Sequence, residues 1–191
     1  MASLNEKVDE LKKQMILETA SEYFKTLGYG KTQIDKISKD LNIGVGTIYG
    51  YFKSKEGLFI AWLQKIINGV YEEMKEGCEK VSDPIEKLAV VIDYKVGYFE
   101  KNRVTVKSYM ENNQLFLRGI SRRKEHPMAI ILEFCADIIK EIKPMSDNEA
   151  YLLANIFDGI LNTYIECSFE DEELFGKKDE ILERFLKLIG V

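Results

Sequence analysis

The sequence predicts an all-α fold, and three observations support this. Apolar residues recur at i, i+3 and i+4 spacing almost everywhere after residue 11, which is the pattern of amphipathic helices. Alternating runs of β-branched residues are few, and the chain has only three prolines. Helix-capping signatures stand before several of the periodic runs. Since 46% of the 191 residues are hydrophobic, the chain can fill a real core, and we expect about nine packed helices.

Three of these helices are expected near the N-terminus. The first spans about residues 6–27, and Gly28 is its expected C-terminal breaker. The sequence Thr-Gln-Ile-Asp has the form of a capping box and predicts a second helix over residues 32–41. Asn42 tolerates a left-handed turn, and a short third helix over residues 45–51 follows it. A helix, a tight turn and a short helix together form the helix-turn-helix outline.

Six further helices are expected in the remainder of the chain. Ser54 can cap the first of them, and SDPIE at residues 82–86 combines an acidic cap with a first-turn proline. Another capping box stands at residues 146–149. The six helices are expected over residues 54–78, 84–100, 102–119, 128–142, 146–169 and 179–189. We therefore expect a helix-turn-helix domain over residues 1–53 and a helical bundle over residues 54–191.

No enzyme chemistry is indicated. The single histidine, His126, stands in a charged loop with no second metal ligand at helical spacing. The chain contains no nucleophile elbow, phosphate-binding loop or dinucleotide fingerprint. Cys78, Cys135 and Cys167 lie far apart among apolar neighbours, which is typical of buried side chains rather than of disulfides or zinc ligands. We therefore predict no catalytic residue, no metal and no cofactor.

Membrane and export segments are not indicated either. No apolar run approaches the roughly 18 residues that a membrane span needs. The N-terminus lacks the apolar region of a signal peptide. We therefore expect a cytoplasmic protein with no membrane partner.

The net charge of -5 is unevenly distributed along the chain. The first 60 residues carry nine lysines and eight acidic residues, so the acidic excess lies in the remainder. Residues 31–55 contain five lysines and two aspartates. This local positive excess is where a phosphate backbone would be favoured.

The uncharged stretch GVGTIYGYF, residues 44–52, has the composition expected of a helix that lies against DNA. Gly44 and Gly46 remove side chains where the helix backbone would approach phosphates. Lys55 would add a charge-assisted contact from the following helix. Three side chains in the stretch can offer hydroxyls to phosphate oxygens, namely Thr47, Tyr49 and Tyr51.

The run from Ile16 to Leu58 resembles the N-terminal domain of the TetR family of transcriptional regulators in residues and spacing. The positions that carry the resemblance are Ile16, Ala20, Phe24, Gly28, Thr32, Ile37, Gly46, Thr47, Ile48, Tyr49, Tyr51, Phe52, Lys53, Ser54, Lys55, Glu56 and Leu58. The resemblance implies a homodimer that binds a palindromic operator, usually represses, and is released by a small-molecule effector. It implies that the stretch from Gly44 to Tyr51 is the recognition helix. By position it also implies DNA-backbone contacts for Thr32, Thr47, Tyr49, Tyr51 and Lys55.

The chain departs from the family pattern in ways that bear on sequence readout. Leu41-Asn42-Ile43-Gly44 stands where the family often has Ala-Gly-Val-Ser, so the usual serine cap is missing. No Arg, Lys, Asn or Gln lies between Gly44 and Phe52 to make bidentate contacts with guanine or adenine. We therefore predict readout of thymine methyls by Val45 or Thr47, help from Gln33, and a large share of shape readout.

The C-terminal part is expected to bind the effector and to dimerise. Its aromatic and amide side chains provide candidates for a hydrophobic ligand pocket. These candidates are Trp62, Tyr94, Tyr98, Met110, Asn113, Phe116, Phe134, Asn155 and Tyr164. The last two helices carry more apolar residues than one side of a small domain can cover, which indicates a homodimer surface. The predicted interface residues are Leu153, Ile156, Ile160, Leu161, Phe185, Leu186 and Ile189.

The preferred interpretation is a ligand-responsive DNA-binding regulator, and we expect a repressor. The alternative is a dimeric helical module for protein-protein interaction whose DNA-binding domain is idle. The uncharged recognition helix and the slight positive excess of the first 60 residues favour that alternative. Salt-dependent binding to duplex DNA distinguishes the two, because only phosphate contacts release condensed counterions.

Overall fold

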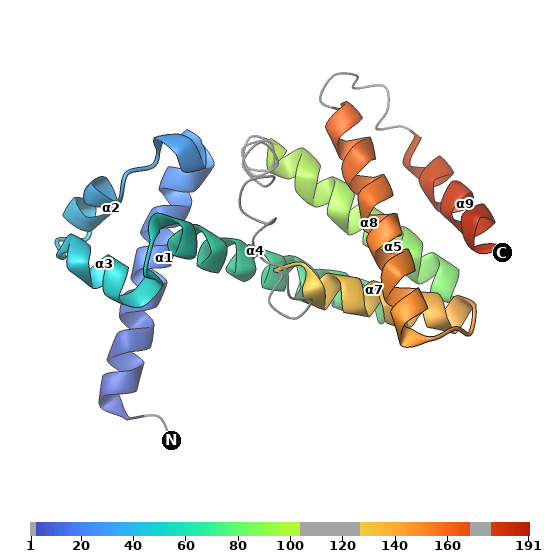
Figure 1. Ribbon diagram of the computed structural model, residues 1–191, viewed down its shortest axis with the longest axis horizontal. Helices are drawn as coiled ribbons and strands as arrows, with labels where there is room; N and C mark the ends of the chain where they lie inside the picture. The colour runs from blue at the N-terminus through green and yellow to red at the C-terminus, as the bar shows by residue number, and fades with distance from the viewer. Residues whose placement is uncertain (1–2, 104–126, 169–176) are drawn as a thin grey trace. The chain divides into compact units, whose positions relative to one another are not determined.

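The computed structural model describes residues 3–103, 127–168 and 177–191, and within these ranges it contains eight helices and no strand (Figure 1). The helices are α1 (Leu4–Lys31), α2 (Ile34–Asp40), α3 (Val45–Phe52), α4 (Lys55–Cys78), α5 (Pro84–Lys101), α7 (Ala129–Ile142), α8 (Asp147–Ser168) and α9 (Lys178–Ile189). The all-α prediction is confirmed. The helix predicted over residues 102–119 lies outside the described residues, apart from its first two positions.

Helix α1 begins two residues earlier than expected because Ser3 and Glu6 form a capping box. The Ser3 hydroxyl accepts from the Glu6 backbone N–H at 3.2 Å, and the Glu6 carboxylate accepts from the Ser3 backbone N–H at 2.7 Å. Gly28 has a φ of 72° and a ψ of 170°, which interrupts the helical backbone as predicted. Residues 29–31 complete the helix after this break.

The capping box predicted at Thr32 is wrong. The Thr32 hydroxyl donates instead to the backbone oxygen of Gly28 at 2.7 Å, and the residue is only 1% exposed. Thr32 is thus the C-cap of α1, while α2 begins after Gln33, which makes no side-chain cap. The predicted left-handed turn is confirmed, because Asn42 has a φ of 52°.

The other predicted caps are confirmed. The Ser54 hydroxyl accepts from the Gly57 backbone N–H at 2.9 Å at the start of α4. The Asp83 carboxylate accepts from the Ile85 backbone N–H at 2.9 Å, next to the first-turn proline of α5. The Ser146 hydroxyl accepts from the Glu149 backbone N–H at 3.3 Å at the start of α8.

The helices divide into two compact units, and the division falls at Ile66, inside α4. The N-terminal unit contains α1, α2, α3 and the first half of α4. The C-terminal unit contains the second half of α4 together with α5, α7, α8 and α9. A separate domain over residues 1–53 therefore stays a prediction, because α4 contributes part of the N-terminal core.

The core of the N-terminal unit joins one face of each of its helices. An aromatic cluster fills its centre, in which the Phe24 ring meets the Phe59 ring edge-on at 5.0 Å and the Trp62 ring at 5.1 Å. The buried members of this core are Ile16, Ala20, Phe24, Ile34, Ile37, Ile48, Leu58, Phe59, Trp62 and Leu63. Burial of Ile48 and Ile37 fixes the angle between α2 and α3, which determines the face that α3 presents outward.

The C-terminal unit is built around the aromatic pair Phe157 and Phe185, whose ring centroids are 4.7 Å apart. Ion pairs link its helices at the surface, such as Lys87 on α5 with Glu141 on α7 at 2.6 Å. Cys78 and Cys135 are buried in this core as predicted, whereas Cys167 is exposed, so the prediction was wrong for that residue. Burial raises the pKa of the Cys135 thiol to about 12, which leaves it inert at neutral pH.

Two further features of the described residues bear on the expectations from sequence. None of the helices described has a stretch long and apolar enough to cross a membrane. Within the described ranges, no three His, Cys, Asp or Glu side chains are grouped as metal ligands would be. His126 lies outside the described residues.

Candidate nucleic-acid interface

Helix α3 has two contrasting faces. Ile48 is fully buried, with 0% exposure, and anchors the helix on the core of the N-terminal unit. The opposite face is exposed and contains Gly44, Gly46, Thr47, Tyr49 and Gly50. This exposed face therefore consists of bare backbone and hydroxyl side chains, with no carboxylate that would repel a phosphate.

The packing of the protein does not explain the glycines on this face. A Cβ added at Gly46 or Gly50 would meet no atom within 4 Å. A Cβ at Gly44 would meet only the Thr47 hydroxyl, at an ordinary 3.8 Å. Gly44 also has a φ of -70°, which any residue adopts. Since neither crowding nor backbone strain requires them, these glycines are best explained by the close approach of another molecule.

The two tyrosines of α3 differ in their surroundings. Tyr49 is 42% exposed. Tyr51 is half-buried, and its hydroxyl donates to a carboxylate oxygen of Asp9 on α1 at 2.7 Å. This hydrogen bond raises the pKa of Tyr51 above its ordinary value, so the hydroxyl keeps its proton at neutral pH. The Lys13 ammonium lies 5.9 Å from the centroid of the Tyr51 ring.

Lys55 is held against α1 rather than extended into solvent. Its ammonium lies 4.4 Å from the centroid of the Tyr29 ring and donates to the backbone oxygen of Gly30 at 3.3 Å. Partial burial lowers the pKa of Lys55 from its ordinary value, because desolvation disfavours the charged form.

The predicted DNA-contacting residues all lie on the N-terminal unit, but the Thr32 side chain is not available for contact with DNA. The Thr32 side chain is buried and its hydroxyl is committed to Gly28, so the predicted phosphate contact is contradicted. Gln33 is exposed at the start of α2. Val45 is half-buried at the first position of α3, with part of its side chain in the core.

Two residues at this surface were not predicted from the sequence, namely Asp9 and Tyr29. Asp9 lies 42 positions before Tyr51, so no local pattern links the two side chains. Tyr29 contacts Lys55 only because the break at Gly28 redirects the chain after α1. Both contacts depend on tertiary packing, which helical periodicity does not specify.

The residues predicted to form a ligand pocket do not come together as one group. The pocket prediction is wrong for Trp62, because this residue is buried in the core of the N-terminal unit, where its indole N–H has no hydrogen-bond partner among the described residues. The pocket prediction is also wrong for Asn155, since this residue is exposed on α8 and its side chain donates to the backbone oxygen of Tyr151. Half-buried positions in the C-terminal unit are occupied by Tyr94, Tyr98, Phe134 and Tyr164. The remaining candidates lie outside the described residues, namely Met110, Asn113 and Phe116.

The predicted dimer residues are also divided by the structure. The interface prediction is wrong for three residues, because their side chains lie in the core of the C-terminal unit. These residues are Leu161, Phe185 and Ile189, which are 1%, 0% and 6% exposed. Half-buried positions are occupied by Leu153, Ile160 and Leu186. Exposed apolar residues remain on α8 at Leu152 and Ile156, which are 60% and 37% exposed. The face of α8 that is free for a partner is therefore narrower than expected.

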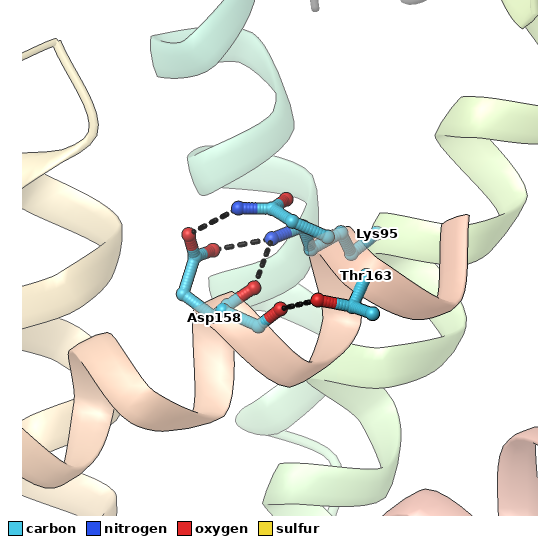
Figure 2. A network of polar contacts seen from close by, with 5 residues as sticks. Lys95, Asp158 and Thr163 are labelled. Atoms are coloured by element: carbon cyan, nitrogen blue, oxygen red, sulfur yellow. Dashed lines mark hydrogen bonds and ion pairs between the residues drawn. The ribbon is translucent and has the colours of Figure 1, made fainter. Parts of the chain in front are cut away.

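A polar network lies between α5 and α8, and Figure 2 shows its members. The Lys95 ammonium pairs with the Asp158 carboxylate, and both side chains are about four-fifths buried. The Asn162 amide donates to the second Asp158 carboxylate oxygen at 2.9 Å, and the Thr163 hydroxyl donates to the Gly159 backbone oxygen at 2.9 Å. The network fixes the register of α8 against α5 and satisfies the buried charges.

Comparisons with known proteins identify the fold and the N-terminal unit. Residues 16–62 match the family model described as bacterial regulatory proteins, tetR family, and this range covers the whole helix-turn-helix. The fold resembles the crystal structure of the transcriptional regulator FadR from Bacillus subtilis, with a TM-score of 0.67, 22% identity, and coverage of 90% of this chain and 96% of that chain. The N-terminal helices are therefore similar to those of the tetR family of bacterial regulatory proteins.

Two curated proteins similar to this chain are regulators by name. The uncharacterized HTH-type transcriptional regulator YhgD of Bacillus subtilis is 30% identical over 112 residues, which cover 54% of each chain. The fatty acid metabolism regulator protein of the same organism is 36% identical over 81 residues, which cover 42% of each chain. The chain aligns with about half the length of these curated relatives or less. At 22% identity, the likeness to the solved FadR structure concerns the fold alone.

Proposed function

We propose that this chain is a TetR-family transcriptional regulator that binds operator DNA through α3. The observation that carries the proposal is the exposed face of α3, where three glycines that the packing does not require stand among hydroxyl side chains. A helix in the major groove must bring its backbone near the phosphates on both walls. Gly44 and Gly46 allow that approach, while Thr47 and Tyr49 can donate to phosphate oxygens.

Sequence preference would come from the few apolar atoms that α3 exposes. We expect Val45→Ala to relax base preference across a panel of operator variants, because it removes the methyl groups that contact thymine methyls. Lys55→Ala is the matched comparison, since it removes a backbone contact and should weaken binding to every variant alike. The measurement is the dissociation constant for each operator variant at one salt concentration. If Val45→Ala kept the base preference of the wild type, Val45 would not contribute to sequence recognition.

We propose in addition that the C-terminal unit binds a hydrophobic effector with a long acyl chain. The solved FadR structure that this fold resembles is a complex with stearoyl-CoA. In the present chain, half-buried aromatic side chains from four helices line the edge of the C-terminal core, and the Tyr71 and Phe134 rings meet edge-on at 5.7 Å. Such side chains suit an apolar chain better than a polar metabolite.

The effector proposal is tested on the complex of protein and DNA. Stearoyl-CoA is expected to lower operator affinity at concentrations where CoA and acetyl-CoA have no effect, because the long chain supplies the apolar contact area. Release follows if the effector binds more tightly to a conformation that does not fit the operator. If stearoyl-CoA binds the protein tightly but leaves DNA affinity unchanged, the ligand does not act as the switch.

We propose finally that the chain acts as a homodimer and represses by occupying a palindromic operator. The exposed apolar residues Leu152 and Ile156 on α8 support a twofold interface, and Gly159 lies on the same exposed face. A twofold dimer would place two α3 helices about one turn of DNA apart, roughly 34 to 36 Å.

A further inference from the structure

The hydrogen bond between Tyr51 and Asp9 places a carboxylate at the end of the proposed recognition helix. The Tyr51 hydroxyl lies 2.7 Å from a carboxylate oxygen of Asp9, which belongs to the exposed first part of α1. A tyrosine hydroxyl has one proton to donate. A carboxylate can only accept it, and so can a phosphate diester at neutral pH. The hydroxyl therefore cannot donate to Asp9 and to DNA at the same time.

We propose that Asp9 limits operator affinity by competing with a DNA phosphate for the Tyr51 hydroxyl proton. This inference rests on the proposed function, in which α3 contacts the DNA backbone. The competition has two components. Asp9 occupies the donor that a phosphate would use, and its negative charge lies within a few ångströms of where that phosphate would sit.

The surroundings of Tyr51 show that Asp9 is not needed to hold the ring in place. The Tyr51 ring contacts the Phe52 ring edge-on at 6.4 Å, and the Lys13 ammonium lies on the ring at 5.9 Å. The ring is also half-buried against the core of the N-terminal unit. Removal of Asp9 should thus free the hydroxyl while leaving the ring where it is. While Asp9 is present, its hydrogen bond raises the pKa of Tyr51, so the hydroxyl keeps the proton that it donates to the carboxylate.

Glu10 provides a matched control for the charge of Asp9. It is the next residue on α1, it is exposed, and its carboxylate lies 3.9 Å from the Lys13 ammonium rather than on Tyr51. Glu10→Gln removes the same negative charge from the same turn of α1. A difference between the two substitutions therefore reports the competition for Tyr51 and not the net charge of α1.

The experiment measures the affinity of the full chain for DNA that the wild-type protein retains from a random duplex pool, over a series of salt concentrations. Asp9→Ala is expected to tighten binding by about tenfold, because a charge-assisted phosphate contact becomes available. Asp9→Asn keeps an acceptor for the hydroxyl but loses the charge, so it should tighten binding by a smaller factor. Glu10→Gln should change affinity by less than about twofold.

The double-mutant cycle with Tyr51→Phe is the sharpest part of the test. In the wild-type background, Tyr51→Phe should cost little affinity, because the hydroxyl is already engaged by Asp9. In the Asp9→Ala background, the same substitution should cost about tenfold, because it removes the newly formed phosphate contact. Weaker DNA binding by Asp9→Ala, or equal effects of Tyr51→Phe in both backgrounds, would overturn the inference. If the wild-type chain shows no salt-dependent DNA binding at all, the proposed function itself is wrong.

Discussion

Gly57→Ala is expected to destabilise the N-terminal unit by about 3 kcal/mol. A Cβ at Gly57 would lie 2.0 Å from the backbone oxygen of Phe52, which is far inside van der Waals contact. That oxygen cannot move easily, because it also accepts from the Ser54 backbone N–H at 2.8 Å in the tight turn between α3 and α4. Lys53, in the same turn, has a φ of 66°. Denaturant unfolding of the purified chain measures the loss.

The matched control for Gly57→Ala is Gly69→Ala on the same helix. A Cβ at Gly69 would meet nothing within 4 Å, so alanine should stabilise α4 by about 0.5 to 1 kcal/mol through its higher helix propensity. The two substitutions make the same chemical change with opposite expected signs. A Gly57→Ala protein as stable as the wild type would show that the turn between α3 and α4 is more open than the structure has it.

Phe185→Ala is expected to cost about 3 to 5 kcal/mol of unfolding free energy. Phe185 is 0% exposed, and its ring packs at a tilt against Phe157 in the centre of the C-terminal unit. Alanine would leave a large cavity between α8 and α9, since rigid helices collapse only partly around it. Because Phe185 is a core residue and not an interface residue, the loss should be independent of protein concentration. Denaturant unfolding at two protein concentrations measures this.

Two exposed leucines serve as controls for Phe185. Leu188→Ala, also on α9 but 59% exposed, should change the unfolding free energy by less than about 0.5 kcal/mol. Leu152→Ala, on the exposed face of α8, should leave the unfolding of dilute protein unchanged and weaken self-association in sedimentation. If the loss of unfolding free energy in Phe185→Ala depended on protein concentration, Phe185 would belong to the dimer interface after all.

The helices of this chain could be predicted from sequence because their signals are local. Caps at Ser54, Asp83 and Ser146 and the break at Gly28 all depend on residues within four positions of one another. Thr32 shows the limit of such signals. Its hydroxyl could accept a hydrogen bond from a backbone N–H at the start of α2, or donate one to a backbone oxygen at the end of α1. Because the helical backbone breaks at Gly28, the hydroxyl donates to the Gly28 oxygen and caps α1.

The sorting of apolar residues between core and interface could not be predicted. Helix α8 is apolar nearly all round, so its periodicity does not distinguish the side that meets α5 and α7 from the side left exposed. Leu161 and Ile156 therefore looked equivalent in sequence, although one is buried and the other is exposed. The contact between Asp9 and Tyr51 was equally inaccessible, since it joins residues 42 positions apart through the packing of α1 on α3.

The central claim is that α3 docks on duplex DNA, and its most direct test is the salt dependence of DNA binding by the wild-type chain. With DNA selected from a random duplex pool, the logarithm of the association constant should fall linearly with the logarithm of salt concentration. The slope should correspond to several phosphate contacts, at about 0.9 for each contact. If α3 docks on DNA, the binding should show this slope, and the retained DNA molecules should share a sequence. A salt-independent association, or retained DNA with no common sequence, would contradict it and would favour a helical module for protein-protein interaction.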